Sequence, residues 1–224
     1  KTIEERISEA LNAYREADKT AKEIDCPAEK YIELLLKYGI FLDDYAYYEE
    51  SIEVNLRFIR LSEETNGQNE ITAASYNNIG IVYRNLGDYD KALEYHFKAL
   101  EIYKALLGEN NSYTAGSYGN IGLVYDNLGD YDKALEYGFK ALEIRKDVLR
   151  ENHPDTASSY NNIGLLYNNL GEYDKTLEYY NKALEIRKDV LGENHPDTAG
   201  SYNNIGAVYD NLGDYDKALE YYNK

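Results

Sequence analysis

The chain has 224 residues, 43% of them apolar, and is therefore long enough to bury a hydrophobic core in one or two domains. Its 41 acidic side chains outnumber its 24 basic ones, and the formal net charge of −17 argues against nucleic acid and anionic membranes as partners. No apolar stretch approaches the roughly 20 residues of a membrane span, and the single cysteine, Cys26, excludes an internal disulfide framework and favours a reducing, cytoplasmic compartment.

The N-terminal part of the chain is expected to be helical. A first helix is predicted over residues 3–24, where apolar residues recur at helical spacing. Within residues 1–28 this helix is either a capping helix or the second half of an earlier repeat. Residues 29–70 are expected to be a degenerate copy of the repeat that follows, because Gly39 aligns with Gly80 of the first clear copy.

A 42-residue repeat occupies the rest of the chain. The phrase SYNNIG or SYGNIG recurs at this interval, beginning at Ser75, Ser117, Ser159 and Ser201. Copies are predicted over residues 71–112, 113–154, 155–196 and 197–224, the last one truncated in its second helix. In the first helix of each copy, helix A, apolar residues recur at i, i+3, i+4 and i+7. A second helix, helix B, follows a turn at a glycine such as Gly87.

The linker between copies carries the start signal of the next helix. In GENHPDTA, Pro196 and Asp197 stand where the first turn of a helix accepts them. His153 and His195 are copies of one linker position and have no ligand-spaced cysteine or histidine beside them. We expect them to cap helices or to lie in exposed loops, and we predict no metal site, no cofactor and no catalytic residue.

The third clear copy shows the repeat pattern in full, with Tyr160, Ile163, Gly164, Tyr167, Thr176, Tyr180 and Ala183. This order of aromatic and small residues resembles the tetratricopeptide repeat, and the long second helix resembles the repeat of kinesin light chains. The resemblance is firm over residues 72–224 and loose over 30–66. It implies an all-α fold, a right-handed superhelical α-solenoid of antiparallel helix pairs, in which each copy stacks on its neighbours. For function it implies a protein-binding scaffold.

In solenoids of this family, the side of helix A opposite its packing face lines a concave groove. Here that side is rich in asparagine, with an aliphatic strip. The expected peptide-binding residues are Asn77, Asn78, Ile81, Arg84, Asn120, Leu123, Asp126, Asn127, Asn161, Asn162, Leu165, Asn168, Asn203, Asn204 and Asp210. Because a carboxamide both donates and accepts hydrogen bonds, this composition suits binding of a peptide backbone.

Two interpretations of these asparagines stay open, since duplication alone also repeats a residue. They bind a partner, or they bond to the neighbouring helix as part of the scaffold. Only Arg84 is basic on this side, against Asp126 and Asp210. We therefore expect a partner segment that is neutral, apolar or basic, and no clamp for a terminal carboxylate.

One helix B position departs from the repeat pattern. His96 and Gly138 stand where Tyr180 supplies a ring in the third copy. A glycine there leaves a gap, which the next residue, Phe139, is expected to fill. Otherwise Phe97 and Phe139 form a small apolar patch on the convex side.

The leading hypothesis for function is a non-enzymatic scaffold that binds a peptide or helical segment of a partner protein in the asparagine-rich groove. The first alternative is a regulatory or sensor segment of a larger signalling protein, since the chain starts at Lys1, lacks methionine and ends within a repeat, as an excerpt would. The second alternative is structural self-assembly, end to end, through the truncated C-terminal helix.

Overall fold

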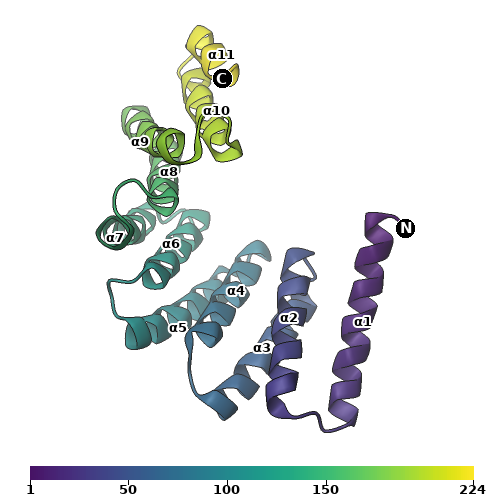
Figure 1. Cartoon of the computed structure of the whole chain (residues 1–224). Helices are drawn as coiled ribbons and strands as arrows, with labels where there is room; N and C mark the ends of the chain where they lie inside the picture. The colour runs from purple at the N-terminus through teal and green to yellow at the C-terminus, as the bar shows by residue number, and fades with distance from the viewer. The chain divides into compact units, whose positions relative to one another are not determined.

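The computed structural model describes all of residues 1–224, which form α-helices joined by short connections, without a β-strand (Figure 1). The eleven helices are α1 (Ile3–Glu23), α2 (Ala28–Asp44), α3 (Tyr48–Asn66), α4 (Glu70–Asn85), α5 (Tyr89–Leu107), α6 (Ser112–Asn127), α7 (Tyr131–Leu149), α8 (Pro154–Asn169), α9 (Tyr173–Leu191), α10 (Pro196–Asn211) and α11 (Tyr215–Tyr222). From α2 onward, a helix A and a helix B alternate as antiparallel pairs, so the predicted all-α solenoid of helix pairs is confirmed.

The helices A begin close to the predicted limits of the copies. Each of the five, α2, α4, α6, α8 and α10, starts one residue before the predicted start of its copy. The division into copies, and the role of α1 as a cap or as part of an earlier repeat, stay predictions. The chain separates into two compact units, Lys1–Ile102 and Tyr103–Lys224. None of the eleven helices is both long enough and apolar enough to span a membrane.

One linker position starts four of the helices A. It is held by Asn69, Asn111, His153 and His195. In each case the side chain accepts a hydrogen bond from the backbone N–H two residues later, which satisfies a free donor of the first helical turn. A proline follows each histidine at the first helical position, where its missing N–H leaves no bond unmade. The expectation that both histidines cap helices is confirmed.

In the unit Lys1–Ile102, α2, α3 and α4 share one hydrophobic core. Leu35, Tyr38 and Phe58 are at its centre, and each is at most 1% exposed. Helix α1 is attached to this core by polar contacts as well as apolar ones. Asp18 of α1 accepts hydrogen bonds from the side chains of α2 and α3, including one of 3.0 Å from Nη1 of Arg57. The N-terminal helix is therefore a packed part of its unit.

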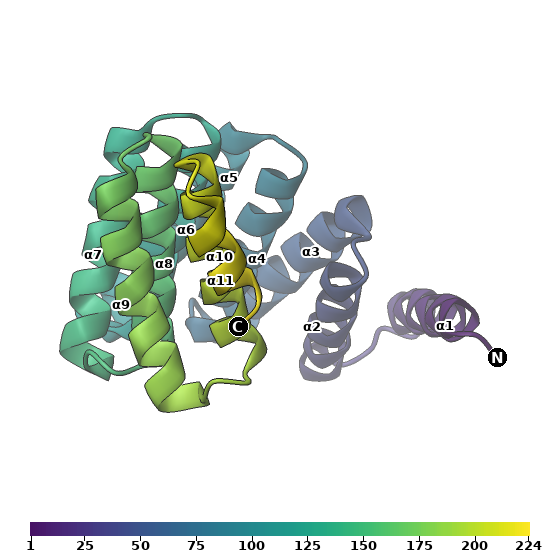
Figure 2. The same ribbon diagram turned by 90° about the horizontal axis from the view of Figure 1, so that it is seen from above.

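In the unit Tyr103–Lys224, α6, α8 and α10 lie in one layer and α7 and α9 in a second (Figure 2). The two layers meet along apolar residues of both. Ile163 of α8, for example, is fully buried and packs with Leu142 of α7 and Ile186 of α9. This packing leaves the opposite side of α6, α8 and α10 outside the core, which is where the sequence places the candidate groove.

Candidate functional site

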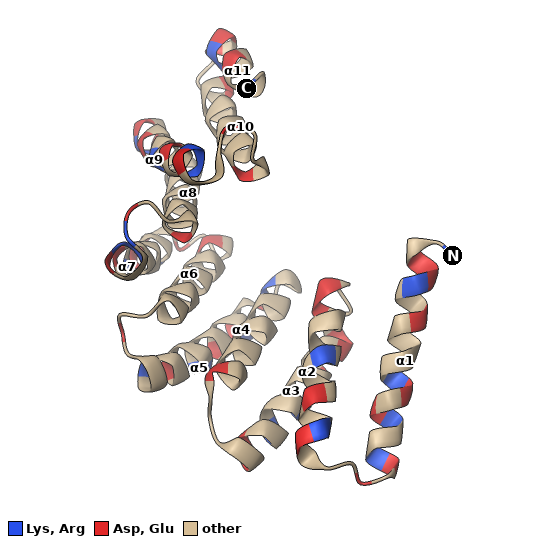
Figure 3. Ribbon diagram, viewed as in Figure 1, with Lys and Arg blue, Asp and Glu red and all other residues tan.

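The fifteen predicted groove residues lie on four helices A, α4, α6, α8 and α10, and none of them is buried. These helices are poor in charge. The only charged side chain of α6 is Asp126 and that of α8 is Asp155, whereas α7 and α9 carry charges along their whole length (Figure 3). Each unit therefore presents an accessible and nearly uncharged helix A surface.

Side-chain hydrogen bonds join neighbouring helices A. Nδ2 of Asn204 on α10 donates to Oδ1 of Asn161 on α8 at 2.9 Å. In a similar way, Nδ2 of Asn169 on α8 donates to Oδ1 of Asp126 on α6, also at 2.9 Å. Both bonds tie one copy to the next, so they support the scaffold interpretation for these particular side chains.

Three asparagines at the repeat position of Asn204 make no side-chain hydrogen bond within the protein, namely Asn78, Asn120 and Asn162. The position that accepts from Asn204 is held by Gly119 in the copy before Asn162, and by Leu36 in the degenerate copy before Asn78. Neither residue has a side chain that accepts a hydrogen bond. The amides of Asn78 and Asn162 are therefore free to bond a ligand. The residue before Asn120 at the accepting position is Asn77, whose Oδ1 already lies 2.9 Å from Nδ1 of His96.

Among the remaining predicted residues, one bonds to a buried side chain, and the others are half-buried or exposed to solvent. Oδ1 of Asn77 lies 2.9 Å from Nδ1 of the buried His96, and so supports that ring. Burial, and then the charge of Arg84, lower the pKa of His96 to about 4, which keeps the ring neutral at pH 7. Asn120 and Asn168 are half-buried, and the exposed residues are Asn127, Leu165, Asn203 and Asp210.

A first hollow lies between α2 and α4, in the unit Lys1–Ile102. It has a volume of about 580 Å³, part of it open to solvent, and is lined by Asn78 and Ile81 together with Asp43 of α2. Oδ1 of Asp43 accepts a hydrogen bond from Ser51, but its Oδ2 is buried without a partner. Burial raises the pKa of Asp43. One carboxylate oxygen beside this hollow is therefore buried and has no hydrogen-bond partner in the protein.

Asp43 was missed by sequence reasoning, because it belongs to the degenerate copy. A signal for it exists. The alignment of Gly39 with Gly80 places Asp43 at the repeat position of Arg84, which is one of the predicted groove residues.

A second hollow opens between α6 and α8 and reaches α7, in the unit Tyr103–Lys224. It has a volume of about 380 Å³, including space open to solvent. It is lined by predicted groove residues of α6 and α8 and by residues of α7, among them the helix B residue Gly138. The predicted residues brought together here are Leu123, Asp126, Asn162 and Leu165.

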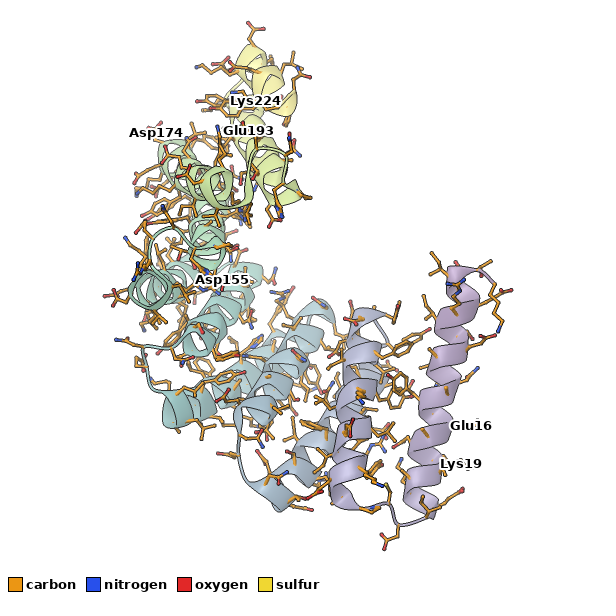
Figure 4. The ribbon with its side chains drawn as sticks, viewed as in Figure 1. Glu16, Lys19, Asp155, Asp174, Glu193 and Lys224 are labelled. Atoms are coloured by element: carbon orange, nitrogen blue, oxygen red, sulfur yellow. The ribbon has the colours of Figure 1, made fainter.

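Arg145 of α7 lines the second hollow as well. Its Nη1 donates to Oγ of Ser159 at 2.7 Å and to the backbone oxygen of Asp155 at 3.2 Å, in the first turns of α8. Asp155 is labelled in Figure 4. Burial lowers the pKa of this guanidinium, which nonetheless stays charged at pH 7 because its usual value is so high. The hollow therefore combines aliphatic walls with a cation, a carboxylate and a free amide. No three His, Cys, Asp or Glu side chains gather anywhere in the chain as a metal site requires.

The gap expected at Gly138 is present, but Phe139 does not fill it. The Phe139 ring is 36% exposed and lies edge-on to Tyr179, with 6.1 Å between the ring centroids. The expectation was wrong because successive residues of a helix point about 100° apart, so residue 139 cannot take the direction of residue 138.

Comparisons with known proteins support the family resemblance. A sequence model of the tetratricopeptide repeat matches the chain four times, over residues 46–105, 71–147, 113–175 and 155–224. Comparison with curated proteins gave no match.

Several solved structures have the same fold. BtubC (BKLC) from P. vanneervenii is similar with a TM-score of 0.78 and 25% identity, over 99% of this chain and 89% of that one. A kinesin light chain-like protein of P. anserina with nearly identical TPR-like repeats has a TM-score of 0.68 and 18% identity, over 85% of this chain and 90% of its own. The apo form of RapI has a TM-score of 0.69 and 23% identity, over 94% of this chain and 56% of RapI.

Proposed function

Because this chain belongs to the tetratricopeptide repeat family, we propose that it is a non-enzymatic scaffold that binds a segment of a partner protein on its helix A surface. The surface offers amides and aliphatic side chains for such a segment. A cytoplasmic location is part of the proposal and rests on the single thiol of Cys26.

One observation carries this proposal: two of the free amides coincide with the hollows. Asn78 stands in the first hollow beside Ile81, and Asn162 stands in the second beside Leu165. A side-chain amide without an internal partner can donate to one peptide carbonyl and accept from one peptide N–H. In an extended segment, successive side chains point to opposite sides, so a side chain next to the bound peptide group can contact the neighbouring aliphatic residue.

The charges around the hollows suit a neutral, apolar or basic partner segment. Asp43 and Asp44 line the first hollow, where the buried oxygen of Asp43 lacks a donor. In the second hollow, Asp126 and Arg145 balance one another in charge. Since the formal net charge of the whole chain is −17, an acidic segment would be repelled as it approaches.

A displayed library of random peptides, panned against the intact chain, tests the proposal. We expect selected peptides to be neutral or basic, and to lose about tenfold in affinity for the variants Asn78→Ala or Asn162→Ala, as loss of a hydrogen bond to a peptide predicts. The matched control is Asn194→Ala, which removes an exposed linker asparagine outside both hollows. Acidic peptides that bind best, or affinities unchanged in both variants, would contradict the proposal.

Self-association is a second candidate. Helix α11 exposes Tyr215 by 65% and Leu219 by 59%, an apolar face that another copy of the chain could cover. Light scattering with size-exclusion chromatography tests it: a mass that stays monomeric at high concentration, and is unchanged by Leu219→Glu, removes this candidate. A regulatory role within a larger signalling protein is a further alternative and would use the same helix A surface.

A further inference from the structure

In three copies of the repeat, a ring of helix B lies against the glycine that recurs in helix A. A Cβ atom added to that glycine would come within 2.6 or 2.7 Å of a ring atom, so the ring occupies the space beside the glycine completely. The three pairs are Gly80 with His96, Gly164 with Tyr180, and Gly206 with Tyr222. The repeat therefore contains a built-in place for one planar ring.

In the copy made of α6 and α7 no ring lies against the recurring glycine: a Cβ atom added to Gly122 would meet the backbone oxygen of Ala134 at 3.2 Å and the backbone nitrogen of Gly138 at 3.5 Å. Gly138 replaces the ring, and a Cβ atom added there would meet Ile163 at 3.5 Å and Leu166 at 3.9 Å, which are ordinary contact distances. The second hollow lies at this point. Since the ring of Phe139 points elsewhere and packs on Tyr179, no side chain of the chain itself supplies the missing ring.

A second departure from the repeat opens the same hollow toward solvent. Gly119 stands where the three other clear copies have Asn77, Asn161 and Asn203, and nothing lies within 4 Å of a Cβ atom added to it. Gly138 removes the ring of helix B and Gly119 removes a side chain of helix A, and both lie in the lining of the second hollow.

We propose that the second hollow binds one aromatic side chain of the partner segment. The ring enters between α6 and α8 and lies beside Ile163 and Leu166. This is the repeat position that the Tyr180 ring holds in the next copy. This inference rests on the proposed function, because the ring belongs to a segment bound on the helix A surface.

The lining of the hollow fits an aromatic side chain better than an aliphatic one. Much of its lining is apolar, and it lies at the repeat position where His96, Tyr180 and Tyr222 supply a ring in the other copies. Arg145 supplies a guanidinium that can lie near the ring face or edge. The free amide of Asn162, in the lining, is positioned to bond the backbone of the same partner residue.

The probe for this proposal is p-cresol, which is the side chain of tyrosine as a free molecule. It is titrated into the intact chain, and the methyl resonances of Ile163, Leu165 and Leu166 are followed by NMR. We expect these resonances to shift with a Kd on the order of 1 mM, as the binding energy per atom of a small ligand predicts. The aliphatic control, 3-methyl-1-butanol, is expected to bind several-fold more weakly.

Two variants fill the hollow and test its location. Gly138→Tyr restores the ring of the other copies, and Gly138→Leu is a smaller filling for use if the tyrosine variant fails to fold. In a folded variant the p-cresol shifts should disappear. A third variant, Tyr180→Gly, empties the same place one copy later and should create a second set of shifts, at Ile205 and Val208, which pack with Tyr180.

The proposal is overturned if p-cresol produces no shift in the original chain, if the shifts persist when Gly138 is replaced in a folded variant, or if the aliphatic control binds equally well. Peptides from the displayed library give an independent result. If selected peptides lack aromatic residues and bind the Gly138→Leu variant unchanged, the aromatic site is wrong while the scaffold function stands. If p-cresol binds but no peptide is selected, the aromatic site stands and the scaffold function loses its support.

Discussion

The side-chain amide of Asn204 donates a hydrogen bond of 2.9 Å to Asn161, and so connects helix α10 to helix α8. The equivalent amide one copy earlier, that of Asn162, has Gly119 opposite it and makes no such bond. The same residue type at one repeat position therefore has different hydrogen-bonding roles in two copies, and experiments can test this difference.

Replacing each of these asparagines by alanine should distinguish a residue that stabilises the fold from a residue that binds a peptide. Asn204→Ala is expected to lower the free energy of unfolding by about 1 kcal/mol, because it removes one hydrogen bond between copies. Asn162→Ala should change it by less than about 0.5 kcal/mol and should instead weaken peptide binding. Urea unfolding and peptide titration measure the two effects. Equal losses of stability in both variants would contradict the assignment.

The variant Gly119→Asn should restore the missing bond. It gives Asn162 the acceptor that Asn204 has in Asn161, and it also replaces a helical glycine. We expect the free energy of unfolding to rise by about 1 to 2 kcal/mol, from the hydrogen bond and the gain in helix propensity together. Peptide affinity should fall, since Asn162 is then occupied. Gly119→Ala is the control, because it gains propensity without an acceptor and should retain peptide binding.

Alanine should have opposite effects at two glycines. In Gly164→Ala the new Cβ would lie 2.6 Å from Cδ1 of Tyr180, and the forced movement of the ring is expected to lower the free energy of unfolding by about 1 to 3 kcal/mol. In Gly138→Ala the nearest contact is 3.5 Å, so the better helix propensity of alanine should raise it by about 0.5 to 1 kcal/mol. Thermal unfolding of both variants decides this. Destabilisation by Gly138→Ala would show that the hollow is closed.

Protonation of His96 should make the N-terminal unit less stable at acidic pH. Burial lowers the pKa of His96 from 6.5 to about 4 in the folded chain. Between these values the unfolded chain binds the proton and the folded chain does not, so stability is complete above pH 6.5 and falls as the pH is lowered toward 4. The loss amounts to about 3 kcal/mol over the whole interval.

The matched variant for this test is His96→Tyr, since tyrosine fills the same place in Tyr180. Carboxylates contribute equally to both proteins, so the difference between their unfolding curves at pH 7 and pH 4.5 isolates the histidine. Curves that stay parallel at both pH values would show that His96 is not the titrating group.

Much of the fold could be predicted from the sequence because the same local helix signals recur in every copy of the repeat. The 42-residue interval, the helical spacing around Tyr76 and Ile79, and the linker prolines were sufficient for the helix pairs and for the starts of the helices A. Local signals of this kind act within a few residues, so they survive without knowledge of the tertiary structure.

The roles of individual groove residues depended on the tertiary structure. Whether an asparagine is free depends on the residue that the previous copy places against it, as with Gly119 before Asn162 and Asn161 before Asn204. The fate of the gap at Gly138 depended on the direction in which Phe139 leaves its helix, and Asp43 mattered only once α2 and α4 had packed around it. Hydrogen bonds and cavities are properties of pairs of segments, and a pair is defined only when the segments meet in space.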